Sequence, residues 1–173
     1  KYDSRAMEQV LALEDSTDRY EDALGTYLVK LSGIQLTVAD NRILNTLLYT
    51  VSDIERIADH AVSVGRAALE MEEKKIHFSE QAQAELDVLE RAISDILSRT
   101  VNAYRSFDRN LAMEVEPQEQ VVDALVREVK SRHIRRLRDG LCSVEYGFVL
   151  EDLLTAFERS ADHCSNVAVE ILQ

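Results

Sequence analysis

The chain has 173 residues with 32 acidic and 20 basic side chains, which gives a formal net charge of −12. A chain of this length is long enough for one domain with a sizeable core, and its 46% hydrophobic content is too high for a disordered protein. The negative charge repels nucleic acid and anionic lipid, so we do not expect a partner of either kind.

Only five Gly and one Pro interrupt the chain. Sandwiches and barrels of many short strands need frequent turn residues, so this composition excludes them and favours long helices. No apolar run approaches the roughly 18 residues of a membrane span. The two cysteines, Cys142 and Cys164, form no CxxC motif and suggest a reducing compartment. We therefore expect an all-α protein of the cytosol or of a cytosol-facing surface.

Apolar residues spaced by three and four predict five long helices. In chain order these helices span about residues 4–31, 38–74, 80–107, 117–140 and 144–172. We expect Gly33 to form a left-handed cap after the first helix, Ser79 to cap the start of the third, and Pro117 to lie in the first turn of the fourth. Long helices with short connections pack as an antiparallel bundle.

The chain contains an internal repeat. Residues 54–64 (IERIADHAVSV) and 157–167 (FERSADHCSNV) share six of eleven residues at an offset of 103, and Asp22-Ala23-Leu24 matches Asp123-Ala124-Leu125 at an offset of 101. We therefore divide one domain into repeat one (1–75) and repeat two (76–173). Repeat two has a helix in front of the matched pair for which repeat one has no equivalent. We expect three-helix repeats with the first helix of repeat one absent, and another element covering its groove.

Each repeat carries an acidic stripe on one helix and a Glu-x-x-x-Asp pair on the next. Residues at i, i+3, i+4 and i+7 share a helix face, and like charges at that spacing destabilise the helix. Five carboxylates per repeat converge if the two helices pack side by side, and oxygen donors of this kind bind hard cations. The acids are Asp15, Asp18, Asp22, Glu55 and Asp59 in repeat one, and Glu116, Glu119, Asp123, Glu158 and Asp162 in repeat two.

A simple solvated acidic face is the alternative to metal binding, and the repetition of the pattern favours metal. His60 and His163 are either further ligands or, more commonly for such residues, hydrogen-bonded packing residues. Arg56 and Arg159 are expected mainly in ion pairs. A basic cluster between Arg127 and Arg138 is interpreted as ion pairing and helix-dipole interaction rather than as a docking patch.

The usual enzyme signatures are missing. The sequence has no Glu-x-x-His, HExxH, GxSxG, Gly-rich phosphate loop or EF-hand pattern. We therefore expect a non-enzymatic protein and no catalytic residues. A carboxylate-bridged di-metal enzyme and a metal-free helical adaptor stay open as alternatives.

The two motifs ERIADHAVSV and FERSADHCSNV, each after an acidic helix, resemble the PhoU family. The region from Val115 to Leu172 and the segment YEDALGTYLVKLS are similar to the cytosolic C-terminal domain of bacterial sodium/phosphate cotransporter-family proteins. The resemblance implies a bundle of two three-helix repeats. It also implies multinuclear metal clusters, of iron or zinc with magnesium or manganese as alternatives, at Glu55, Asp59, Glu158 and Asp162 with the acids of the stripes.

The resemblance also implies a function, which composition and spacing do not supply. We expect a regulatory domain that modulates phosphate uptake at the cytosolic face of the inner membrane. It would belong to a sodium/phosphate cotransporter and form a homo-oligomer, with a dimer expected. The alternative from the same fold is a free-standing regulator of an ABC-type phosphate transporter and a sensor kinase.

Overall fold

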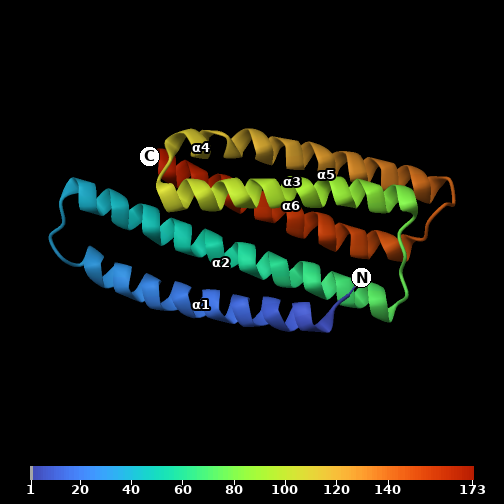
Figure 1. Ribbon diagram of the computed structural model, residues 1–173, viewed down its shortest axis with the longest axis horizontal. Coiled ribbons are helices and arrows are strands. Elements are labelled where there is room, and N and C mark those ends of the chain that lie inside the picture. Colours follow the sequence, from blue (N-terminus) through green and yellow to red (C-terminus); the bar gives the residue numbers. More distant parts are fainter. Residues whose placement is uncertain (1) are drawn as a thin grey trace.

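The computed structural model describes residues 2–173 and contains six helices within them. They are α1 (Ser4–Ser32), α2 (Val38–Glu73), α3 (Glu80–Ser106), α4 (Arg109–Met113), α5 (Val115–Arg138) and α6 (Val144–Leu172). Figure 1 shows the five long helices running side by side along the long axis, with consecutive long helices antiparallel. The described residues form no strand, which confirms the all-α bundle of five long helices. No helix within them is both long and apolar enough to cross a membrane.

The helices begin where short polar side chains cap them. Asp3 accepts hydrogen bonds from the first turn of α1, Thr37 and Asp40 form a capping box on α2, and Ser79 caps α3 as predicted. Pro117 lies in the first turn of α5, where its missing N–H costs nothing. The predicted boundaries of the long helices are confirmed to within about two residues.

The predicted left-handed cap at Gly33 is wrong. Gly33 has a φ of −80°, because the last turn of α1 tightens and the Gly33 and Ile34 N–H groups donate to carbonyls three residues back. The residues with positive φ are Lys75, Phe107 and Gly140, after α2, α3 and α5. Three other helices therefore end in the left-handed conformation that was expected for α1.

The short helix α4 was not predicted. It follows the left-handed residue Phe107, is capped by Asp108, and leads directly into α5. Arg109 at its start donates from Nη1 to the carbonyl of Ile171 at 3.3 Å and also bonds the carbonyl of Leu172. The α4 segment thus provides hydrogen-bond donors for the otherwise unpaired carbonyls at the end of α6.

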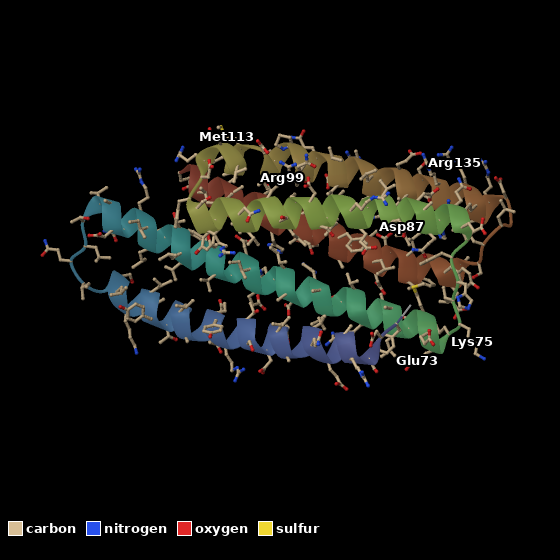
Figure 2. All side chains as sticks on the ribbon, in the orientation of Figure 1. Glu73, Lys75, Asp87, Arg99, Met113 and Arg135 are labelled. Atoms are coloured by element: carbon tan, nitrogen blue, oxygen red, sulfur yellow. The ribbon has the colours of Figure 1, made fainter. Side chains whose placement is uncertain are left out.

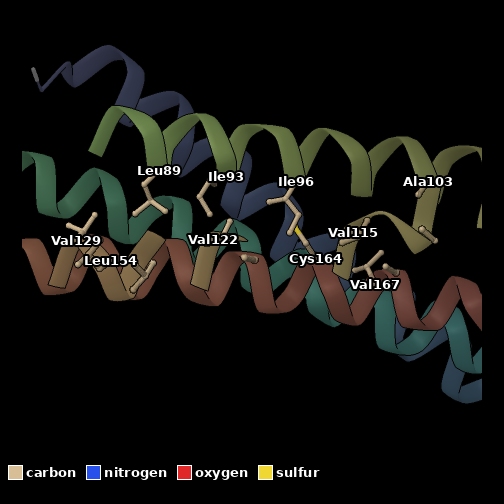
Figure 3. Packing of buried hydrophobic residues seen from close by; sticks show 14 of the residues in the cluster. Leu89, Ile93, Ile96, Ala103, Val115, Val122, Val129, Leu154, Cys164 and Val167 are labelled. Carbon is tan, nitrogen blue, oxygen red and sulfur yellow. The ribbon is translucent and has the colours of Figure 1, made fainter. Parts of the chain in front are cut away.

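The main core lies in repeat two, between α3, α5 and α6. Figure 3 shows side chains of α3 directed at those of α5 and α6, with Ile96 beside Cys164. Cys164 is fully buried, and burial raises the pKa of its thiol to about 11, so it is an inert core residue. By contrast, Leu28 is the one buried residue of α1. The α1–α2 pair joins this core through α2, which packs against α6.

The basic cluster of α5 is taken up by ion pairs, which supports its interpretation as a structural feature. Each of its six side chains contacts an acid, and Figure 2 shows Arg135 near the end of α5. The pairs are Arg127–Asp123, Lys130–Glu151, Arg132–Glu128, Arg135–Glu128, Arg136–Glu85 and Arg138–Asp139. The Arg136–Glu85 pair differs from the others because its side chains are only 10% and 7% exposed.

We predict that Glu85→Gln lowers the free energy of unfolding by roughly 3 to 5 kcal/mol, since it leaves the buried Arg136 guanidinium without a counter-charge. Urea denaturation followed by circular dichroism measures the change. The control is Glu128→Gln, which disrupts exposed ion pairs of α5 and should change stability far less. Equal effects of the two variants would contradict the structural role of the buried pair.

Candidate functional site

Three of the predicted acids meet between α5 and α6. Glu119 and Asp123 lie one turn apart on α5, and Asp162 approaches them from α6. One carboxylate oxygen of each lies within 4.8 Å of the others, and all three residues are half-buried. We call Glu119, Asp123 and Asp162 the acidic triad.

The triad concentrates negative charge that the protein only partly neutralises. Burial raises the pKa of Glu119, and the charges of Asp123, Glu116 and Asp162 raise it further, while Arg127 opposes them. Asp123 Oδ2 lies 3.3 Å from Arg127, but its Oδ1 is buried without a hydrogen-bond partner. Asp162 lies 3.6 Å from Arg159 in an intrahelical pair, the use expected for that arginine. The triad therefore retains a buried acceptor that has no hydrogen-bond partner within the described residues.

The two remaining predicted acids of repeat two lie near the triad with other partners. Glu116 accepts a hydrogen bond from the Ser165 hydroxyl of α6. Glu158 lies 3.8 Å from the Lys130 ammonium. Both residues thus contribute to the α5–α6 contact from outside the triad.

In repeat one the structure does not bring the predicted acids of α1 together with those of α2. Asp15, Asp18 and Asp22 lie on the exposed side of α1, and Asp15 pairs with Arg19 at 3.1 Å. Glu55 on α2 is half-buried and Asp59 is exposed. Among residues 2–173, the only group of three possible ligands that lie close together is the triad.

The acid of α1 that approaches Glu55 is Glu21, which sequence reasoning missed. Burial raises the pKa of Glu55, and the charges of Asp59 and Glu21 raise it further. Glu21 belongs to the inner face of α1, which carries the half-buried Met7, Val10 and Glu14 and the buried Leu28. The signal for this face is the helical spacing of its apolar residues. Steps of three and four from Met7 and Val10 toward Leu28 pass through residues 14 and 21, so both glutamates lie on the inner side.

The two motif histidines pack against each other between the repeats. The rings of His60 on α2 and His163 on α6 stack with centroids 5.6 Å apart and planes 22° apart. His163 Nδ1 donates to Asp53 Oδ1 at 2.8 Å, and Asn166 donates to the same oxygen at 3.1 Å. Burial lowers the pKa of His60, and His163 lowers it further. The histidines thus serve in packing, the commoner of their two expected uses, and Asp53 is a further residue that sequence reasoning missed.

The donor set of the triad fits a hard cation. Three oxygens at most 4.8 Å apart can each lie within about 2.8 Å of a shared ion, so a small closure of the triad reaches the distances of about 2.3–2.6 Å that Ca²⁺ requires and a larger one those of Mg²⁺. Carboxylates also suit manganese and oxidised iron, whereas zinc favours nitrogen and sulfur donors. A cation would also provide the partner that Asp123 Oδ1 lacks.

We predict that Glu119→Gln stabilises the metal-free protein by about 0.2 to 0.5 kcal/mol near neutral pH, because it removes like-charge repulsion within α5. The raised pKa means that folded Glu119 binds its proton more tightly than unfolded Glu119. The wild type therefore gains stability from this group as the pH falls, and the variant loses that gain. Urea denaturation in a chelator at two pH values measures both effects, with Glu8→Gln on exposed α1 as control. A Glu119→Gln variant that is less stable than the wild type in chelator would contradict the proposed repulsion between the carboxylates of α5.

One protein-family model matches this chain over most of its length. The model of the PhoU domain matches residues 1–68 and 86–171. A PhoU homologue 1 of Thermotoga maritima, named a phosphate-specific transport system accessory protein, is 26% identical over 134 residues, which are 76% of this chain and 56% of that protein. A homologue of the same name from Pseudomonas aeruginosa is 23% identical over 96% of this chain and 68% of its own length. The chain thus spans little more than half of the Thermotoga relative.

Solved structures show the same fold. The crystal structure of PhoU from Pseudomonas aeruginosa superposes with a TM-score of 0.89 at 22% identity, over 98% of this chain and 81% of that one. PhoU from Streptococcus pneumoniae, described as a phosphate transport system regulatory protein, gives a TM-score of 0.82 at 18% identity over 96% and 77% of the two chains. The helical arrangement and the match of the family model agree, and the chain belongs to the PhoU family.

Proposed function

We propose that this protein is a non-catalytic PhoU-type regulator of phosphate transport. The observation that carries the proposal is the match of the PhoU domain to both repeats. The names of the relatives support it, because those from Thermotoga and Pseudomonas are called accessory proteins of a phosphate-specific transport system. An accessory role also fits a chain in which the usual enzyme motifs are missing.

These names favour the free-standing regulator over the cotransporter domain. A regulator of this kind acts on an ABC-type transporter and a sensor kinase, whereas the alternative acts on a sodium-coupled transporter. In either case we propose that the protein works at the cytosolic face of the membrane. The carboxylate-bridged enzyme is the weaker hypothesis, since the names of the relatives describe accessory proteins and no enzyme.

We also propose that the acidic triad holds a hard cation, with Glu116 and Glu158 beside it. The support is geometric: three oxygens within 4.8 Å, a buried acceptor on Asp123 without a partner, and charges that raise the pKa of Glu119. A bound cation supplies positive charge between α5 and α6, where the protein has accumulated negative charge. The acids of α5 and α6 would bind the ion and thereby fix the relative position of these helices.

We predict that protein purified without a metal-affinity tag contains magnesium, manganese, calcium or iron, and that Asp123→Asn/Asp162→Asn removes at least 90% of the metal of repeat two. The variant keeps the shape of both side chains and removes two charged ligands. Elemental analysis and calorimetric titration with Mn²⁺ measure the loss.

The matched control is Asp15→Asn/Asp18→Asn, which removes two exposed charges of α1. This variant should keep the metal of the triad. Equal metal content in the wild type and both variants would show that the triad is an ion-free cluster.

We predict that the protein restores phosphate-dependent control in a bacterium that lacks its own PhoU. Uptake of radioactive phosphate through the ABC-type transporter should fall to the level of the parent strain when phosphate is plentiful. Sodium-dependent uptake is measured in parallel with the same cells.

A change confined to sodium-dependent uptake would instead support the cotransporter domain. No change in either uptake, with the protein present at normal levels, would contradict a regulatory function.

A further inference from the structure

Two pockets lie along the contact between α2 and α6, which run side by side and antiparallel (Figure 1). One is formed by residues 60–70 of α2 and 152–156 of α6, has a volume of about 350 Å³, and is called the Arg66 pocket. The other is formed by residues 49–53 and 166–170, has a volume of about 270 Å³, and is called the Asp53 pocket. All six residues that line the Asp53 pocket lie 103 positions from residues that line the Arg66 pocket. The internal repeat therefore makes the two pockets equivalent.

The Arg66 pocket opens on the side of α2 that points away from α3. It is lined by positions 63, 66 and 70 of α2, whereas positions 61, 64 and 68 line a different cavity together with α3. On a helix these two sets of positions point in nearly opposite directions. The pocket is thus separate from the main core.

The Asp53 pocket contains an anion that the protein itself supplies. Asp53 Oδ1 accepts a hydrogen bond from His163 Nδ1 at 2.8 Å and another from Asn166 at 3.1 Å. The residues equivalent to these two donors are His60 and Ser63, and both line the Arg66 pocket. The Arg66 pocket therefore has donors at the two places from which the other pocket holds a carboxylate.

The Arg66 pocket lacks the carboxylates of its equivalent. Alanine stands at the positions of Asp53 and Glu170, and Arg66 stands at the position of Val169. The Arg66 side chain is exposed and forms no ion pair within residues 2–173. An oxyanion from solution can therefore take the place that Asp53 fills in the equivalent pocket.

Positive charge reaches this pocket although the whole chain is negative. Burial and His163 lower the pKa of His60, Arg159 and Arg56 lower it further, and Asp59 opposes them. The charges of two arginines thus act on a ring that lines the pocket, in addition to the guanidinium within it. This local field favours an anion.

One acceptor in the pocket selects among anions. Glu70 is paired with Lys74 at 2.8 Å, whereas Asp152 has no ion-pair partner in the part of the chain that the structure describes. An ionised carboxylate only accepts hydrogen bonds. Asp152 therefore repels an oxyanion without a proton, such as sulfate, and can accept a bond from the O–H that inorganic phosphate keeps near neutral pH.

We propose that the Arg66 pocket binds inorganic phosphate, with donors from Arg66, Ser63 and Thr155 and with Asp152 accepting from the phosphate O–H. A guanidinium binds phosphate through two parallel hydrogen bonds. Hydroxyl groups rotate, so Ser63, which donates to the carbonyl of Asp59 at 3.1 Å, can turn to a ligand. The inference rests on the proposed function, because phosphate is the solute whose transport the protein would regulate.

Calorimetric titration of the full chain with inorganic phosphate tests the site, at constant ionic strength and both with and without a chelator. We expect binding that the chelator does not change, because the pocket requires no metal. Sulfate should bind about tenfold more weakly, since it offers Asp152 no proton. Methyl phosphate should also bind more weakly at about pH 8, where its phosphate group has lost its last proton.

Variants of the protein locate the site. Arg66→Gln should weaken phosphate binding about tenfold, whereas Arg91→Gln, which removes an exposed charge from α3, should leave it unchanged. Asp152→Asn should let sulfate bind about as tightly as phosphate. Ala156→Asp introduces the carboxylate of the Asp53 pocket and should abolish binding. Circular dichroism checks the fold of each variant, and the series of anions tests the wild type even if Ala156→Asp does not fold.

Four results would overturn the inference. They are no phosphate binding, equal binding of phosphate and sulfate by the wild type, binding that the chelator abolishes, and unchanged binding by Arg66→Gln. None of them depends on uptake. A protein that controls uptake without binding phosphate would contradict the pocket alone, and one that binds phosphate without affecting uptake would contradict the regulatory function alone.

Discussion

The packing of α2 against α6 holds the two repeats together, and the other features of the molecule depend on it. Three polar contacts in this interface act between side chains far apart in sequence: the stack of His60 on His163, the bond from His163 to Asp53, and the bond from Asn166 to Asp53. Since α1 contacts the rest of the protein through α2, the loss of this interface would separate the repeats. Asp53 has the central place, because one of its oxygens accepts both bonds from α6.

The internal repeat makes this interface nearly symmetric, and the differences within it are informative. His60 and His163 occupy equivalent positions, but the position equivalent to Asp53 is Ala156. Within residues 2–173, His163 therefore has a hydrogen-bonded carboxylate partner and His60 has none. These half-buried polar contacts exist on one side of the interface only. They favour a single register, because a slipped arrangement would leave Asp53 and His163 without their hydrogen bond.

Sequence periodicity is sufficient for the long helices and for the acidic triad of repeat two, and insufficient for the acids of repeat one. Caps such as Ser79 and Thr37 and the apolar spacing of three and four are local signals, so the helix boundaries follow from them. The triad also follows, because Glu119, Asp123 and Asp162 lie beside a closed core that orients α5 and α6. In α1 the same reasoning fails. Besides the predicted stripe, α1 carries other acids, including Glu14 and Glu21. Contacts with α2 decide which acids face inward, and they place Glu14 and Glu21 inside and Asp18 outside.

The uneven core has a consequence for the dynamics of the protein. Local opening requires little free energy where few apolar contacts are lost, and α1 buries only Leu28 while α5 buries four valines in the core of repeat two. We therefore expect backbone amides of α1 to exchange with solvent through local opening of that helix, whereas those of α5 exchange only when the whole protein unfolds. A ligand that packs on α1 slows its exchange in proportion to its affinity, so hydrogen exchange in this helix reports whether its surface is occupied.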